Sequence, residues 1–339
     1  MSTGKRIAID AMGGEGGISV TLPAAAQALQ TNSELQLYLV GDKDQMDVFL
    51  PLFSQSSRSR VDIIHTIDVI TDDDKPANVL RSGKQSSMYK AVELVKNGSA
   101  QAMVSAGNTG ALLMIGRHLL KTIPGIQKPA MVATIPGASR QSYLLDVGAN
   151  PECDGQQLFE FAVMGAAMAE SLLGEQVRVG LLNIGSEYYK GNNEVQAAAA
   201  LLNACAGINY VGFIEANALF KGYADVVVCD GFVGNVTIKC SAGVANVVKG
   251  LLHEQFKRSW FSRVSKIFAA PLLTRLNAQI DPHQFNGASL LGLQGSIVKS
   301  HGNASIEGFT YAIKQGIVEI ENAVPQLIAK KVAAIMAVK

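Results

Sequence analysis

The chain has 339 residues, of which 48% are hydrophobic and 17% are charged, and its formal net charge at pH 7 is +1. This composition excludes an intrinsically disordered chain, and the length provides an ample core for one large α/β domain or two smaller ones. The balanced charge, the single Trp and the 6% aromatic content argue against nucleic acid as a partner, because such proteins need basic surfaces and aromatic rings for base stacking.

The first half of the chain alternates apolar strand-like runs with helical stretches. Strands are predicted at residues 6–10, 35–40, 60–64, 100–105 and 131–134. Helices are predicted at residues 24–29, 44–53 and 88–96, and a further one ends at residue 120. Ser86 and Ser87 are typical N-cap residues for the helix at 88–96, and Asn97-Gly98 is a typical helix end.

The same alternation continues in the second half. Strands are predicted at residues 143–147, 177–182, 210–214, 225–229 and 295–299, and helices at 158–173, 197–205 and from 306 onward. The strand at 225–229 is β-branched and apolar, as buried parallel strands are. Residues 230–235 are predicted to form a loop, because their two glycines interrupt both the strand and the helix periodicity. A helix is predicted to begin at Val236.

Strands that alternate with helices predict a parallel sheet with helices on both faces. Ligands of such sheets bind in the loops beyond the carboxyl ends of the strands, and a glycine-bearing loop at the start of a helix suits an anion. We expect several such loops to form one active cleft. They are found at Gly13/Gly14, Gly107/Gly110, Gly148, Gly185 and Gly231/Gly234.

Several common motifs are missing. The glycine run at residues 13–17 lacks GxGxxG spacing, and neither a GxxxxGK[ST] P-loop nor a GxSxG elbow occurs. His253-Glu254 begins like a HExxH zinc site, but Lys257 stands where the second His is needed. The chain therefore has loops that suit phosphate without a nucleotide or zinc signature.

The cysteines indicate a reduced, cytosolic chain. They form no CxxC pair, so we expect no metal site and no disulfide framework. Two of them fall on predicted buried faces and are expected to be small core residues, namely Cys229 and Cys240. The full set is Cys153, Cys205, Cys229 and Cys240.

We expect a soluble protein that can still contact a membrane. Residues 1–6 are too short and polar for a signal peptide, and no uninterrupted apolar run reaches the roughly 18 residues of a membrane span. Residues 255–280 contain five basic residues and no acidic one, with Trp260, Phe261 and Phe268 on one helical face. This pattern fits a helix on an anionic membrane surface, or a helical hairpin packed at a dimer interface.

Two loops contain candidate anion-binding residues. Asn108, Thr109 and Gly110 offer an amide, a hydroxyl and backbone donors at a helix start, although ordinary helix capping explains them equally well. Asn183 and Lys190 follow the strand at 177–182. A lysine in a loop is usually only solvated, but beside other loops that suit anions it becomes a plausible phosphate partner.

Three further residues have both a structural and a chemical interpretation. Asp230 is expected to brace its loop more than to act in catalysis. Asn235 has a side-chain amide that can donate to a developing oxyanion. His301 lies in a Lys-Ser-His-Gly loop, where a site role and a local hydrogen bond are equally probable a priori.

Taken together, these segments resemble the PlsX family, the bacterial phosphate acyltransferases of phospholipid synthesis. The matching pieces run in order from residue 7 to about residue 302 and cover nearly the whole chain. AGNTGAL and CDGF-x-GNV together are the most specific of them. The pieces are IAIDAMGG, VSAGNTGALL, LLDVGAN, VGLLNIG, YKGN, VVVCDGFVGNVTIK, NGASLLGL and VKSHG.

The resemblance implies a Rossmann-like α/β/α sandwich with a largely parallel sheet, similar to the phosphate acetyltransferases and the isocitrate/isopropylmalate dehydrogenase group. It implies one domain over residues 1–339, with an amphipathic helical insertion at 255–280. It also implies a homodimer in the cytoplasm, associated peripherally with the inner face of the cytoplasmic membrane. A downstream glycerol-3-phosphate acyltransferase is a candidate partner.

The implied reaction converts acyl-[acyl carrier protein] and inorganic phosphate into acyl phosphate and free carrier protein, without a cofactor. The family implies that Lys190 and Asn235 are essential. Alternatives are a phosphate acetyltransferase-like enzyme that uses coenzyme A, or a membrane-associated scaffold of lipid synthesis. The expected substrate-binding residues are Gly13, Gly14, Asn108, Thr109, Gly110, Asn183, Gly185, Asp230, Gly231, Gly234 and His301, and the expected membrane contacts are Trp260, Phe261 and Phe268.

Overall fold

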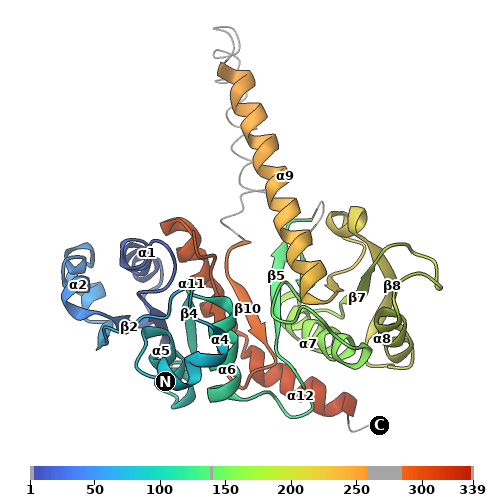
Figure 1. Cartoon of the computed structure of the whole chain (residues 1–339), viewed down its shortest axis with the longest axis horizontal. Helices are drawn as coiled ribbons and strands as arrows, with labels where there is room; N and C mark the ends of the chain where they lie inside the picture. Colours follow the sequence, from blue (N-terminus) through green and yellow to red (C-terminus); the bar gives the residue numbers. More distant parts are fainter. Residues whose placement is uncertain (1–3, 138–139, 258–284, 337–339) are drawn as a thin grey trace.

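The computed structural model describes residues 4–137, 140–257 and 285–336. Within these ranges, eleven strands form one continuous sheet in the order β3-β2-β1-β4-β11-β10-β5-β6-β9-β7-β8 (Figure 1). The strands are β1 Lys5–Asp10, β2 Leu35–Gly41, β3 Val61–His65, β4 Ala102–Ser105, β5 Ala130–Ile135, β6 Ser142–Leu145, β7 Arg178–Asn183, β8 Asn209–Glu215, β9 Val226–Val228, β10 Ala288–Leu291 and β11 Ser296–Lys299.

Two parallel blocks make up most of this sheet. One consists of β3, β2, β1, β4 and β11, and the other of β6, β9, β7 and β8. The blocks are joined by β10, which is antiparallel to both β11 and β5, and by β5, which is antiparallel to β6. The largely parallel sheet is thus confirmed, whereas the sequence did not predict β10 or the antiparallel connection.

Helices cover both faces of the sheet, as alternate side chains of one strand show. On β1, Ile7 and Ile9 belong to the core under α1 and α11, and Ala8 between them belongs to the core under α5 and α6. The helices are α1 Ile18–Thr31, α2 Lys43–Asp47, α3 Gln55–Arg58, α4 Pro76–Ser82, α5 Ser87–Lys96, α6 Thr109–Leu120, α7 Gly155–Leu173, α8 Asn193–Asn203, α9 Gly231–Lys257, α11 Ile306–Glu321 and α12 Val324–Met336, with 3₁₀ turns η1 Leu50–Leu52 and η2 Ala216–Lys221.

Two predicted boundaries were wrong. The helix predicted at 44–53 is divided into α2 and η1, since Pro51 lies at the start of η1 and removes a backbone donor. The helix predicted from Val236 begins five residues earlier, at Gly231. Asp230 caps this start, because its Oδ1 accepts the backbone N–H of Val233 at 2.8 Å.

The long helix α9 rises out of the body of the molecule between its two halves (Figure 1). The side chains on the outward face of α9 are therefore not covered by other described residues. Cys240 is exposed, so the prediction of a buried Cys240 was wrong. Cys229, at the end of β9, is buried as predicted. The expected membrane contacts Trp260, Phe261 and Phe268 lie in 258–284, outside the described residues. Among the helices that are described, none combines the length and the hydropathy that crossing a bilayer requires.

Candidate active site

The first turns of α9 pack tightly on the loop that follows β6. The N–H of Gly231 donates to the carbonyl of Asn150 at 2.7 Å. A Cβ on Gly234 would lie only 1.8 Å from the carbonyl oxygen of Asp146, and one on Gly231 would lie 2.7 Å from that of Asn150. Both glycines are therefore needed for this close backbone contact, and Asp230 braces the helix start.

Asn235 lies one turn into α9 and faces the same loop. Its side chain is half-buried, and its amide carbon would lie 3.6 Å from a Cβ built on Gly148. Gly148 has a φ of 135°, a conformation that side chains rarely adopt. The amide of Asn235 is thus held beside a stretch of backbone that only glycine fits well.

Asp146 organises this loop, and the sequence did not single it out. Its buried carboxylate accepts the N–H groups of Met131, Gly148, Ala149 and Asn150 at 2.7–3.1 Å, and the side-chain amide of Asn150 at 2.9 Å. Burial raises the pKa of Asp146, while these donors favour its ionised form. The LLDVGAN motif was the available signal, because an Asp before Val-Gly-Ala-Asn can collect successive N–H groups.

Three neighbouring strands of the first block end in a buried polar row. Lys299 of β11 is paired in register with Ser105 of β4, and Asp10 ends β1 on the other side of β4. Ser105 Oγ donates to Asp10 Oδ2 at 2.6 Å, and Lys299 Nζ donates to the carbonyls of Ala106, at 3.2 Å, and Ser300. Burial raises the pKa of Asp10 and lowers the pKa of Lys299 to about 8.

The glycine loop after β1 packs on this row. A Cβ on Gly13 would lie 2.6 Å from Asp10 Oδ2. Gly14 has a φ of 85°, and the next N–H, of Glu15, donates to the carbonyl of Gly302 at 2.8 Å. These two glycines thus bring the loops after β1, β4 and β11 together by backbone contact.

Asn108 caps the start of α6, which is the structural interpretation that the sequence offered beside a ligand-binding role. Asn108 Oδ1 accepts the N–H of Ala111 at 3.0 Å, and its amide donates to the carbonyls of Thr71 and Asp72 at 3.3 Å. Thr109 and Gly110 form the first turn. Nearby, Ala149 belongs to the same hydrophobic cluster as Ala111, so the loop that contacts Asn235 also approaches α6.

His301 lies in the loop that follows β11. Its backbone N–H donates to Asn286 Oδ1 at 3.0 Å, and its side chain is exposed. The surrounding protein, followed by the charges of Lys299 and of Lys239 on α9, lowers the pKa of His301.

Lys190 makes its contacts within its own loop, after β7. Its carbonyl accepts the side-chain amide of Asn183 at 3.1 Å and that of Gln196, and its Nζ lies 5.8 Å from the ring centroid of Tyr189. Gly185 is adjacent, since a Cβ there would lie 3.1 Å from Lys190 Cγ. This group lies beyond the end of β7, which is paired in parallel with β9.

The structure thus forms three groups from the predicted site residues. The first lies in the loops after β1, β4 and β11, which contacts around Gly13 and Gly14 join, and it includes Asn108 and His301. The second is the start of α9 with Asn235, which packs on the loop after β6. Asn183, Gly185 and Lys190 form the third group, at the end of the strand next to β9.

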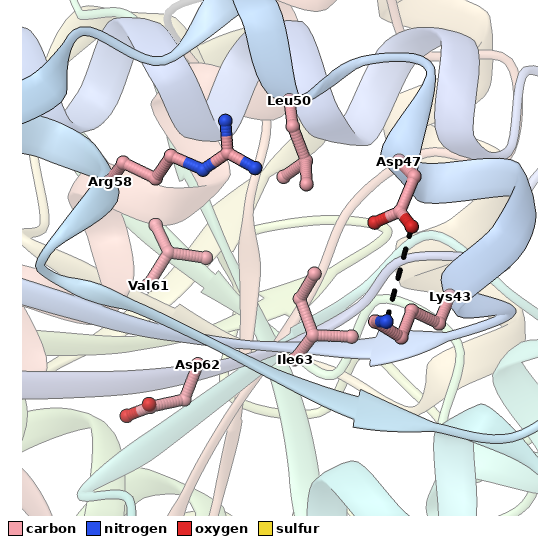
Figure 2. A pocket seen from close by; sticks show the side chains of 7 residues that line it. All are labelled: Lys43, Asp47, Leu50, Arg58, Val61, Asp62 and Ile63. Atoms are coloured by element: carbon pink, nitrogen blue, oxygen red, sulfur yellow. Dashed lines mark ion pairs between the residues drawn. The ribbon is translucent and has the colours of Figure 1, made fainter.

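A surface hollow of about 580 Å³ lies at the edge strand β3, two strands away from β1 (Figure 2). Lys43, one of its two cationic side chains, forms an ion pair with Asp47 at 4.0 Å. It contains none of the predicted site residues, so we assign it no role in the chemistry. It is lined by Lys43, Asp47, Leu50, Arg58, Val61, Asp62 and Ile63.

Comparison with known proteins places the whole chain in one group. A family model described as "Fatty acid synthesis protein" matches residues 5–327. The chain is 47% identical over 334 residues to a protein of Halorhodospira halophila named phosphate acyltransferase, covering 98% of this chain and 97% of that protein. It is 48% identical over 319 residues to the phosphate acyltransferase of Stutzerimonas stutzeri, covering 94% of this chain and 90% of that protein.

The fold is shared with a phosphotransacetylase from Streptococcus pyogenes. The two structures superpose with a TM-score of 0.60 and 19% sequence identity, over 98% of this chain and 95% of that one. This confirms the expected similarity to the phosphate acetyltransferase fold.

Proposed function

The chain belongs to the fatty acid synthesis protein family, the PlsX family, and from this membership we propose that it is a phosphate acyltransferase acting on acyl-[acyl carrier protein] and inorganic phosphate. The products are acyl phosphate and free carrier protein, which feed phospholipid synthesis. The observation that carries the proposal is 47–48% identity to curated phosphate acyltransferases over nearly the full length.

The chemistry requires little from the protein beyond binding and charge stabilisation. Phosphate is a nucleophile at neutral pH, and a thiolate leaving group, with a thiol pKa of about 8.5, needs little help from a general acid. The protein has to aim phosphate at the thioester carbonyl and stabilise the tetrahedral oxyanion. We assign the oxyanion to the amide of Asn235, and Lys190 with loop N–H groups to phosphate.

Transfer is direct in this mechanism, without an acyl-enzyme. Cys229 is close to Asn235 in the sequence, but it is buried, and burial followed by the charge of Asp230 raises the pKa of its thiol well above the ordinary value. Such a thiol supplies no thiolate near neutral pH. Phosphate oxygen therefore forms the new bond to the acyl carbon as the carbon–sulfur bond breaks, and the carrier protein leaves as thiolate.

Trapping with hydroxylamine tests this function. Acyl-[acyl carrier protein] is incubated with the purified chain, with and without phosphate, and acyl hydroxamate is measured. We expect hydroxamate only when phosphate is present. A product that forms equally well from acetyl-coenzyme A would support the phosphate acetyltransferase-like alternative instead, and no product with a verified carrier protein would contradict both.

We extend the proposal to the assembly and location of the protein. One side of α9 exposes Val236, Val244, Val247 and Leu251, with Cys240 between them, at the spacing of a helix–helix seam. This seam supports a homodimer formed through α9. The basic and aromatic composition of 255–280, with Trp260, Phe261 and Phe268, supports peripheral contact with the inner face of the cytoplasmic membrane. There a glycerol-3-phosphate acyltransferase would consume the product.

The continuous eleven-stranded sheet of the described residues supports one domain over residues 1–339, with the amphipathic segment 255–280 as an insertion within it.

A further inference from the structure

Three large apolar side chains close to Lys190 are exposed to solvent. Ile184, Tyr188 and Tyr189, in the loop between β7 and α8, are 81%, 85% and 65% exposed. None of them joins a hydrophobic cluster of the described residues. Single exposed apolar residues are ordinary, but three in the stretch 184–189 form a patch, and such patches typically mark a binding surface.

The backbone of this loop is held at both ends, although its apolar side chains are uncovered. Asn183 Oδ1 accepts the N–H of Ile184 at 2.9 Å, and the amide of Asn183 donates to the carbonyl of Lys190 at 3.1 Å. Gln196 of α8 donates to the carbonyls of Tyr188, at 2.8 Å, and of Lys190. Two side-chain amides thus fix the shape of the loop, so a ligand that covers the patch orders little backbone when it binds.

The aromatic part of the patch continues to the ammonium of Lys190. The ring of Tyr188 packs edge-on against that of Tyr189, with the centroids 5.6 Å apart and the ring planes at 89°. Lys190 Nζ lies 5.8 Å from the centroid of the Tyr189 ring, within the range of cation–π attraction. The patch is therefore continuous with the cation that we assign to phosphate.

The loop also lies at the sheet edge from which α9 starts. β7 and β9 are neighbouring parallel strands, so the segments that follow them leave the sheet at the same edge. Ile238 of α9 packs on the hydrophobic cluster that contains Leu182 of β7. The patch is thus on the strand next to the one that leads into Asn235.

We propose that Ile184, Tyr188 and Tyr189 bind the acyl chain of acyl-[acyl carrier protein]. This inference rests on the proposed function and names the residues that favour long chains. A ligand that covers a patch continuous with Lys190 arrives with one of the two substrates. Phosphate is small and entirely polar, whereas an acyl chain is apolar along its length and is stabilised by covering apolar surface.

Binding of acyl-[acyl carrier protein] without phosphate, and hence without turnover, tests the surface. The acyl groups compared are acetyl and palmitoyl, because only the longer chain can cover the patch. The key variant is Ile184→Ser with Tyr188→Ser, since both side chains are exposed and outside the hydrophobic clusters. Ile67→Ser with Tyr223→Ser is the matched control, because these residues are 68% and 57% exposed and lie in other loops.

We expect the wild type and the control variant to bind the palmitoyl form more tightly than the acetyl form by the same factor. In the key variant this preference should fall about tenfold, because less apolar area is covered. Tyr188→Phe alone keeps the ring and should keep the preference. In the hydroxamate assay, the key variant should raise the KM for the palmitoyl form by the same factor and leave the KM for phosphate within about twofold.

A key variant that keeps the wild-type preference for palmitoyl would overturn the inference, as would a wild type without that preference. Equal losses for the two acyl groups would also overturn it, because the surface would then contact the carrier protein. Conversion of a dimer into monomers in the key variant, measured by light scattering, would assign the patch to an interface between copies instead.

A wild type that forms no acyl phosphate would contradict the proposed function. In that case, a preference for palmitoyl that the key variant loses would still support the surface, because binding is measured without turnover.

Discussion

At the scale of single residues, the proposed chemistry depends most on Asn235. Its amide is the side-chain donor at the start of α9, and Gly148 and Gly234 hold it close to the loop after β6. Removing one donor to a developing oxyanion typically lowers kcat by about 10²–10³. We therefore expect Asn235→Ala to lose activity by about this factor while the KM for phosphate changes little.

Asn246→Ala is the matched control for this substitution, because Asn246 is an exposed residue on the same helix. It should keep wild-type turnover. Near-normal turnover of a folded Asn235→Ala variant would show that the oxyanion is stabilised elsewhere.

A second residue-scale prediction concerns Glu319 of α11, which is buried and has no hydrogen-bond partner for Oε1 among the described residues. Burial raises its pKa from 4.5 to about 7, although Ser289 and Ser296 hydrogen-bond to it. Because the folded-state pKa is raised, its contribution to stability is complete below about pH 4.5 and is lost as pH rises toward 7. This difference in pKa corresponds to about 3 kcal/mol.

Glu319→Gln keeps the shape of the side chain and removes the ionisation. We expect the free energy of unfolding of Glu319→Gln to rise relative to that of the wild type as pH increases from 5 to 8, as urea denaturation at each pH would measure. Stability profiles of the two proteins that stay parallel over this range would contradict the assignment.

At the scale of elements, the sequence predicted the helix ends that are determined by interactions between residues close together in the chain. Ser86 caps α5, with its side chain accepting the N–H of Tyr89, and Asn97 ends the helix, as the sequence indicated. The start of α9 was missed, because Gly231 and Gly234 resemble loop residues. These helical positions require glycine because the neighbouring backbone at Asp146 and Asn150 leaves no room for a Cβ, a constraint between segments about 85 residues apart.

The same limit applies to the site. The sequence singled out the glycine loops and Asn235 as candidates, but not the row formed by Asp10, Ser105 and Lys299, which depends on the pairing of three strands distant in sequence. Short β10 was missed for a similar reason: four residues, Ala288–Leu291, acquire their strand conformation from antiparallel neighbours on both sides.

An element-scale prediction concerns the exposed seam of α9. Val244 and Val247 are 66% and 62% exposed, and two lysines there would place charges in a helix–helix interface. If the chain forms the proposed homodimer through α9, we expect Val244→Lys with Val247→Lys to convert it into monomers, as light scattering after gel filtration would measure. Val48→Lys, at a valine that is 76% exposed in the N-terminal part, should leave the dimer intact. A double variant that stays dimeric would show that the interface does not involve this seam of α9.

At the scale of the whole molecule, one sheet joins two parallel blocks, and α9 leaves from the region between the two halves (Figure 1). The loops after β1, β4 and β11 meet in one block, and the start of α9 packs on the loop after β6 in the other. The fold is that of a phosphotransacetylase, while the sequence relationship is to phosphate acyltransferases.

The most direct test of this account is the fate of isotopically labelled phosphate. The purified chain is incubated with acyl-[acyl carrier protein] and ¹⁸O-labelled phosphate, and both the product and the protein are analysed by mass spectrometry. The account predicts labelled acyl phosphate, one free carrier protein for each product, and a chain of unchanged mass. An acyl group attached to the chain, or release of carrier protein that does not depend on phosphate, would contradict direct transfer to phosphate.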